Sequence, residues 1–229
     1  MSIGDAEIKT QKRVIRFFKD PEILGYQYIG NLSDYQNKNI KEDRLRQYLR
    51  LKGYADKLID VAVMQLQQEA GNLSRGVYDA NKTVYSRLKY GIPVSESPEK
   101  PPVTVELIDE ANPLNNDFAI AEEVTVVEQQ EKRPDLVIYL NGIAVAVIEL
   151  KRSSISVSEG IRQNLTNQKD SFIRGFFTTM QFCMAGNESE GLRYGTLLTG
   201  EKFYMEWKDD GFKEHELSLI HISEPTRRS

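Results

Sequence analysis

An Asn-Gly pair between two apolar runs constrains this chain more than any other feature of its sequence. Residues 133–153 read RPDLVIYLNGIAVAVIELKRS, and Asn141-Gly142 separates two stretches rich in β-branched residues. Asn-Gly favours the tight turns that join antiparallel strands, so the stretch predicts a β-hairpin. Both strands are apolar enough for burial, yet they carry Asp135 near one end and Glu149 and Lys151 at the other.

The register of this hairpin decides whether the three charges meet. Side chains alternate along a strand, so Glu149 and Lys151 share a face. If Asn141-Gly142 forms a two-residue turn, Asp135 pairs with Ile148 and lies on the opposite face from Glu149.

A three-residue loop with a left-handed Gly142 gives the second register. Tyr139 then faces Ile143, Asp135 pairs with Val147, and all three charges share one face. Asn-Gly suits both turns, so the sequence leaves both registers open, and only the bulged one brings the charges together.

Convergence of these charges would make a metal site. Two carboxylates supply the hard oxygen ligands that Mg²⁺ prefers, and a neighbouring lysine can orient or help activate a water. The alternative is structural: Asp135 begins a strand, and Glu149 and Lys151 form an exposed pair at its end. The hairpin and its apolar flanks favour the site.

Several classes of protein are excluded by residue usage. The chain has 229 residues, and its only cysteine is Cys183, so it has no intrachain disulfide and no cysteine-based zinc site. Its two histidines, His215 and His221, lie far from the hairpin, which argues against a Ser-His-Asp hydrolase or a histidine-rich metal site. The start lacks the apolar core of a signal peptide, and no run is long enough to span a membrane, so we expect a cytoplasmic protein.

Charge is distributed unevenly along the chain. Residues 1–90 hold 16 Lys and Arg against 11 Asp and Glu, whereas residues 91–229 hold 14 against 23. A basic front and an acidic back suit a protein that touches a polyanion with one part and holds a cation with another, although two differently charged surfaces explain them equally well. Arginine and tyrosine also interleave from Arg44 to Tyr54, a pattern that can grip nucleic acid but is more typical of a solvated helix face.

Periodicity predicts a helical front followed by an α+β core, with a central mixed, partly antiparallel sheet flanked by helices. We expect helices near residues 5–19, 41–52, 55–69, 79–88 and 156–169, and strands near 26–32, 103–108, 118–127, 181–185, 194–199 and 202–207 around the hairpin. The proposed division is a front at 1–92 that includes the first helix of the core, a proline-rich connector at 93–102, and a core at 103–216.

The last thirteen residues look foreign to the protein. LSLIHISEPTRRS back-translates into what resembles a transposase-type sequencing adapter. We therefore expect the natural sequence to depart from this one after about Glu216, and we assign residues 217–229 no function.

The hairpin resembles a known nuclease signature. Asp135 followed by Glu149-Leu150-Lys151 is similar to PD-(D/E)xK, with Pro134 supplying the proline. The segments TQKRVIRFF, NDFAIAEEVTV, KRPDLVIYLNGIAVAVIELKRS, SEGIRQNLTNQKDSFIRGFFTTMQ and MAGNESEGLRYGT resemble the amino-terminal domain of the restriction subunit of type I restriction endonucleases. This resemblance extends from about Thr10 to about Trp207.

The resemblance implies roles for particular residues. Asp135 and Glu149 would ligate a catalytic Mg²⁺, and Lys151 would serve the attacking water. Glu7 corresponds to an acidic residue that many such nucleases add to the metal site, or it is a solvated helix glutamate. Gln163 matches the glutamine of a glutamine–tyrosine motif that touches the DNA backbone, but Asn167 stands in place of the tyrosine.

Four further residues have weaker assignments. Arg152 and Arg162 are candidates for phosphate contacts, with solvated arginines as the alternative. Asn116 and Asp117 match a family motif and read first as turn residues that enter a strand.

The resemblance also implies partners. In this family the subunit continues into motor domains that use ATP, and it works on double-stranded DNA with methyltransferase and specificity subunits. The chain contains no G-x-x-x-x-G-K-[ST] phosphate loop, so we expect it to hold the cleavage site without binding ATP. The alternatives are another PD-(D/E)xK nuclease of repair or recombination, or an inactive DNA-binding module; the intact Lys151 argues against the second.

Overall fold

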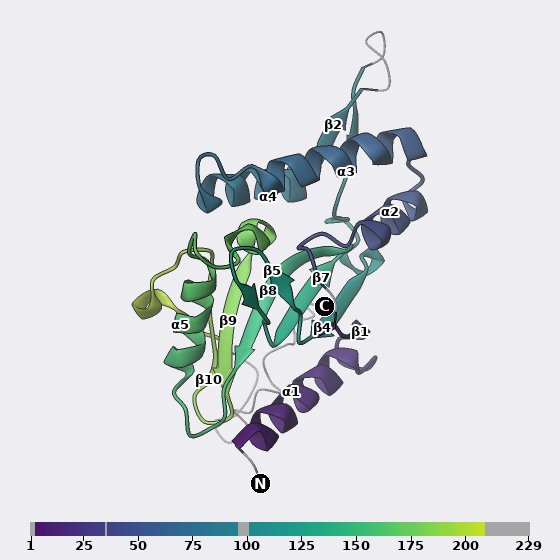
Figure 1. The fold of residues 1–229 in the computed structure, drawn as a ribbon. Coiled ribbons are helices and arrows are strands. Elements are labelled where there is room, and N and C mark those ends of the chain that lie inside the picture. The colour runs from purple at the N-terminus through teal and green to yellow at the C-terminus, as the bar shows by residue number, and fades with distance from the viewer. Residues whose placement is uncertain (1–2, 35, 96–100, 209–229) are drawn as a thin grey trace.

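A mixed seven-stranded sheet forms the centre of the molecule (Figure 1). The computed structural model describes residues 3–34, 36–95 and 101–208. Residues 96–100 of the predicted connector and the whole predicted tail lie outside them. Within the described chain, no helix is long and apolar enough to cross a membrane.

The sheet has the strand order β1-β4-β7-β8-β9-β10-β11. The β1–β4 and β8–β9 pairs are parallel, and the other neighbours are antiparallel. Together with its helices this is the α+β fold that the periodicity predicted. The strands are β1 (Gln27–Asn31), β4 (Phe118–Glu122), β7 (Leu136–Leu140), β8 (Ile143–Leu150), β9 (Phe182–Asn187), β10 (Gly191–Gly195) and β11 (Met205–Glu206).

Helices cover both faces of the sheet (Figure 1). Helix α1 (Ile3–Lys19) packs Val14, Ile15 and Phe18 against one face, where the strands present residues such as Ile120 and Ile148. Helix α5 (Val157–Asn167) and the 3-10 helix η2 (Arg174–Thr179) lie on the other face. The sheet is thus buried on both sides, which is why its central strands are almost continuously apolar.

A group of three helices and two short strands packs against the turn of the β7–β8 hairpin. Helices α2 (Glu42–Leu51), α3 (Asp56–Gly71) and α4 (Val77–Tyr90) share a core with the short strands β2 (Ile92–Val94) and β3 (Val103–Val105), which pair with each other. Ile143 of β8 belongs to the same core, so the helices are packed onto the hairpin. The front also supplies α1 and β1 to the sheet layer. The predicted domain limits therefore stay a prediction.

Several predicted strands are shorter than expected. The strand predicted at 103–108 is β3, which ends at Val105, and the strand predicted at 202–207 is reduced to β11 because residues 201–203 form a 3-10 helix. The strand predicted at 194–199 is β10, which ends at Gly195 and is followed by a turn in which Thr199 donates to the carbonyl of Thr196. The strand predicted at 118–127 breaks after Glu122, because Glu123 adopts a left-handed backbone with φ +52°. The remaining short elements are η1 (Pro113–Asn115), β5 (Val126–Val127), β6 (Glu131–Lys132) and η3 (Glu201–Phe203).

Candidate active site

The hairpin turn is the two-residue one. Leu140 pairs with Ile143, and both turn residues have positive φ, +52° at Asn141 and +82° at Gly142. This backbone suits the right-handed twist of the two strands. Of the two turns that the sequence left open, the three-residue loop with a bulge at Gly142 is therefore not the one formed.

A bulge nevertheless brings the charges together, and it lies inside β8. Tyr139 pairs with Ala144, but the next residue of β7, Ile138, pairs with Ala146, so Val145 is the extra residue. From there the register runs to Leu136 opposite Ile148, which brings Asp135 opposite Glu149. Directly opposed residues share a face. Asp135 and Glu149 therefore do share a face, but the cause is the extra residue Val145 and not the hairpin turn.

The turn itself is held by a buried polar cluster. The side chain of the fully buried Asn141 donates to the carbonyl of Leu107 and to Asn116 Oδ1, each at 2.8 Å, and accepts from the backbone N–H of Asp117 at 2.7 Å. Asn116 also accepts from the backbone of Asp109. Asn116 and Asp117 thus tie the segment before β4 to the hairpin, which fits their reading as turn residues.

Asp135 and Glu149 form a buried pair of carboxyl groups whose charged forms are disfavoured. Asp135 Oδ2 accepts from the backbone N–H of Leu150 at 2.6 Å, which holds Asp135 against the end of β8. Burial raises the pKa of Asp135 to about 6, and the charges of Glu123 and Glu7 act in the same direction. Burial, followed by the charge of Asp135, raises the pKa of Glu149 well above its usual value. The two groups resist being charged together unless a cation joins them.

A glutamine links the catalytic candidates on the strand to helix α5. Gln163 Nε2 donates to Glu149 Oε2 at 2.6 Å, and Gln163 Oε1 accepts from Lys151 Nζ at 2.8 Å. Helix α5 can lie this close to the sheet because Gly160 packs where a Cβ atom would stand 2.9 Å from the Cβ of Ala185. The structure therefore groups Asp135, Glu149, Lys151 and Gln163.

Glu123 is a member of this group that sequence reasoning missed. Its charge acts on both Asp135 and Glu149. Gln11 of α1 donates to Glu123 Oε1 at 3.1 Å and to Glu122 Oε2 at 3.0 Å, and Arg133 Nε lies 2.8 Å from Glu123 Oε2. The sequence predicted that the strand continues through AEEV, residues 121–124. The chain instead turns at Glu123, where φ is positive, and the backbone N–H of Glu123 donates to the carbonyl of Asp135.

The other predicted site residues lie at the margin or elsewhere. Glu7 is close enough for its charge to act on Asp135. Arg152 is half-buried directly after Lys151. Arg162 is exposed on α5 and forms ion pairs with Glu159 and Glu201 at 2.8 Å, so it is not grouped with Lys151. Asn167, in place of the family's tyrosine, is buried at the end of α5.

The pair of carboxyl groups fits a divalent cation. Glu149 is fully buried, and its Oε1 has no hydrogen-bond partner among the described residues. A cation would satisfy this oxygen and relieve the repulsion between the two carboxylates. Across the described chain no three histidine, cysteine or acidic residues gather closely enough to hold a metal, so Glu7 does not complete a three-acid group here. Two protein carboxylates with water in the remaining positions suit Mg²⁺.

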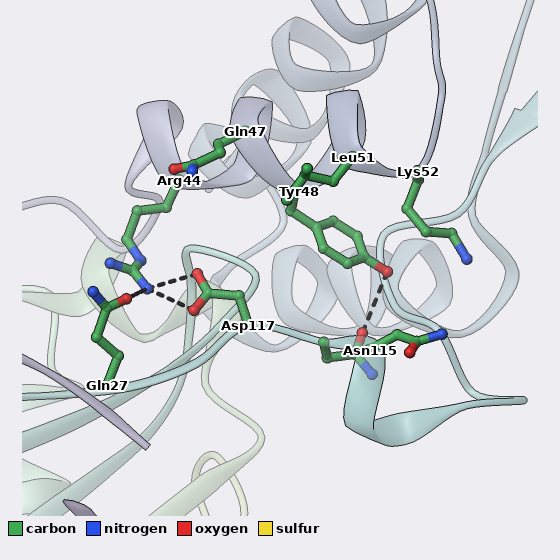
Figure 2. Close-up of a pocket in the computed structure, with 9 residues that line it drawn as sticks. Gln27, Arg44, Gln47, Tyr48, Leu51, Lys52, Asn115 and Asp117 are labelled. Atoms are coloured by element: carbon green, nitrogen blue, oxygen red, sulfur yellow. Dashed lines mark hydrogen bonds and ion pairs between the residues drawn. The ribbon is translucent and has the colours of Figure 1, made fainter. Parts of the chain in front are cut away.

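A pocket of about 480 Å³ is lined in part by Asn116 and Asp117 (Figure 2). These two residues contact Asn141 of the hairpin turn, so the pocket lies near the turn and away from Asp135 and Glu149. Arg44, which lines it, is paired with Asp117 at 2.6 Å, and the hydroxyl of Tyr48 donates to Asn116. Arg46 and Arg50 are also in ion pairs with neighbouring acids. The arginines of this pattern thus form ion pairs within the chain. The lining of the pocket also lacks the two carboxylates that a divalent cation would need.

Residues 7–203 match the family model described as the type I restriction enzyme R protein N terminus. The chain belongs to this family. The match includes all the grouped residues, and it favours the restriction-enzyme reading over a nuclease of repair or recombination.

Individual relatives agree with the R-protein family. A putative type I restriction enzyme endonuclease subunit, MjaIXP, from Methanocaldococcus jannaschii is 33% identical over 97 residues, 39% of this chain and 9% of the relative. The SsaAORF53P endonuclease subunit of Staphylococcus saprophyticus is 27% identical over 138 residues, 55% of this chain and 15% of the relative. The SauMSSORF170P endonuclease subunit of Staphylococcus aureus is 27% identical over 111 residues, which are 47% of this chain and 12% of the relative. The matched region is therefore a small part of each relative's length.

Proposed function

We propose that this chain is the nuclease domain of the restriction subunit of an ATP-dependent type I restriction enzyme, and that it hydrolyses phosphodiester bonds of double-stranded DNA with Mg²⁺. The observation that carries the proposal is the arrangement of Asp135 opposite Glu149. Glu149 Oε1 accepts no hydrogen bond from the described part of the chain, and Gln163 bridges Lys151 to Glu149. Family membership and the names of the relatives support it.

In this mechanism Asp135 and Glu149 would hold the cation. A bound Mg²⁺ lowers the pKa of a coordinated water and offsets charge that develops on the phosphate. Lys151 Nζ has three donors, one of which is used by Gln163, so it can donate to the attacking water while Gln163 keeps it in place. The water oxygen would bond to phosphorus as the bond to the leaving oxygen breaks; the water would lose one proton to solvent, the leaving oxygen would take one proton from solvent, and the ammonium would stabilise the added negative charge.

The same proposal extends to partners. The motor that uses ATP, and the methyltransferase and specificity subunits, would belong to the rest of the enzyme, because this chain has no phosphate loop and matches only 9% to 15% of its relatives. The DNA sequence would be read by another subunit, and this domain would supply the cleavage site. The location consistent with this role is the cytoplasm.

The first test separates metal binding from cleavage. Calorimetric titration of the chain with Mn²⁺ should show weak binding that Asp135→Ala abolishes and Lys151→Ala retains. In the assembled full-length enzyme both substitutions should remove cleavage of plasmid DNA. Asp170→Ala changes an exposed aspartate whose ion pair in the described part of the chain is with Arg174; it is the matched control and should leave both measurements unchanged.

Two outcomes would contradict the proposal. Unchanged Mn²⁺ binding in Asp135→Ala would remove the metal site, and retained cleavage in Lys151→Ala would remove Lys151 from its role. An enzyme that binds DNA but has no Asp135-dependent cleavage would instead be the inactive binding module.

A further inference from the structure

Arg133 lies two residues before Asp135, on a segment held by backbone hydrogen bonds. It stands in the irregular stretch between β6 and β7, and the chain bends at Asp135. Two backbone hydrogen bonds fix this stretch, from Val124 to the carbonyl of Pro134 at 3.0 Å and from Glu123 to the carbonyl of Asp135 at 2.8 Å. The base of the Arg133 side chain is therefore held at a set place relative to the site.

Glu123 forms an ion pair with the Arg133 guanidinium. Its Oε2 lies 2.8 Å from Arg133 Nε, and its Oε1 accepts from Gln11, which is itself buried. Both oxygens of Glu123 are thus engaged, and the left-handed backbone that aims this side chain costs about 1 kcal/mol or more in a residue other than glycine. A strained residue with both oxygens engaged is typical of a site that needs a particular geometry.

The rest of the guanidinium is available to a ligand. The Arg133 side chain is 56% exposed, and no described residue accepts a hydrogen bond from its two Nη groups. An arginine whose ion pair is formed at Nε leaves these two groups as a planar fork that matches two oxygens of a phosphate. By contrast, Arg162 uses Nε and both Nη groups on Glu159 and Glu201.

We propose that Arg133, oriented by Glu123, binds a backbone phosphate of DNA next to the bond cleaved at Asp135 and Glu149. The inference rests on the proposed nuclease function and deepens it: Arg133 is the DNA-contacting group, and Glu123 is a positioning residue that acts through it. Neither residue belongs to the three-residue nuclease signature.

The test measures the salt dependence of DNA binding by the chain. Binding of a short fluorescently labelled duplex is followed by anisotropy over a series of NaCl concentrations, in chelator so that no cleavage occurs. Removing one phosphate contact should lower the slope of log K against log salt by about 1. Arg133→Gln should therefore show this smaller slope and bind about 10-fold more weakly at low salt.

Companion variants separate charge from orientation. Arg133→Lys keeps the charge, so it should restore the slope but not the cleavage rate of the assembled enzyme. Glu123→Gln should keep the slope and lower kcat with little change in KM, because the guanidinium remains but is no longer aimed. Arg193→Gln is the matched control: this arginine pairs with Glu206 near the far edge of the sheet, and its loss should change neither measurement.

The outcomes distinguish this inference from the proposed function. An unchanged salt slope in Arg133→Gln, with circular dichroism showing a folded protein, overturns the role of Arg133. If Asp135→Ala still loses cleavage in that case, the nuclease function stands without it. If Glu123→Gln cleaves at the normal rate, Glu123 has no positioning role.

Discussion

At the scale of residues, Asp135 and Glu149 are buried acids that lower the stability of the fold that holds them. Each is desolvated, and the charge of Asp135 raises the energy of the charged form of Glu149. Functional groups often depart from the rules that stabilise a fold, and this pair does so on two otherwise apolar strands. The sequence displayed the charges plainly, because an acid in an apolar strand is conspicuous in any register. Glu123 was not visible in the same way, since nothing local to AEEV predicts a left-handed backbone.

A first prediction concerns stability in the absence of metal. Asp135→Asn should raise the midpoint of thermal unfolding in chelator, because it removes a buried charge. The folded pKa of Asp135, about 6, lies above its unfolded value near 4, so the folded state binds more protons between these values. Stability from this group therefore falls as pH rises from about 4 to 6. Unfolding followed across that range should show a smaller fall in Asp135→Asn; an equal fall in both proteins would contradict the assignment.

A second prediction concerns Gln163, which contacts both Glu149 and Lys151. Gln163→Ala leaves both groups without their shared partner, and outer-shell partners of metal sites contribute about 10- to 100-fold to affinity or activity. We expect a loss of cleavage in that range in the assembled enzyme, with a fold as stable as that of the parent. Ser158→Ala, on the first turn of the same helix, is the control. Full activity of Gln163→Ala would show that the bridge is not used.

At the scale of elements, one inserted residue in β8 decides the geometry of the site. The extra residue Val145 shifts the register so that Asp135 lies opposite Glu149. The sequence predicted the hairpin and both of its strands, because Asn-Gly and β-branched residues are local signals. It did not predict the bulge, since bulge position depends on how the strand packs: Val145 leans toward the core of the helical front, and its carbonyl accepts from Gln181.

A third prediction tests the contact between the turn and the helical front. A Cβ atom at Gly142 would stand 2.6 Å from the carbonyl oxygen of Lys41 and 2.8 Å from the backbone nitrogen of Leu45, and φ there is +82°. Gly142→Ala should therefore lower the free energy of unfolding by about 1–3 kcal/mol. Denaturant titration measures this. Gly30 also has a positive φ, but a Cβ atom there would have nothing within 4 Å. Gly30→Ala should therefore lower the free energy of unfolding less, by the cost of the backbone conformation alone.

At the scale of the whole molecule, four segments distant in sequence meet at one end of the sheet. Helix α1 supplies Gln11 and Glu7, the end of β4 supplies Glu123, the β7–β8 hairpin supplies the carboxylates and Lys151, and α5 supplies Gln163 (Figure 1). Periodicity predicted a sheet with helices, and the charges on the hairpin predicted a site there. The family resemblance added Gln163 and Glu7. Neither could place Glu123 or Arg133, because their roles depend on contacts between segments.

The fourth prediction follows from this assembly. A cation that joins Asp135 and Glu149 removes their repulsion, so saturating Mn²⁺ should raise the unfolding midpoint of the parent chain; at 100 times the dissociation constant the gain is about 2.7 kcal/mol. The Asp135→Ala variant should show no metal-dependent rise. A similar rise in both would place the cation elsewhere.

The most direct test of the central claim is the anomalous scattering of Mn²⁺ in crystals of the chain. We predict an anomalous peak within coordination distance of Asp135 and of Glu149 Oε1, the buried oxygen that has no hydrogen-bond partner among the described residues. The same peak should be absent from crystals of Asp135→Ala. A peak at any other position, with no density between these two carboxylates, would contradict the assignment of the metal site and the nuclease function built on it.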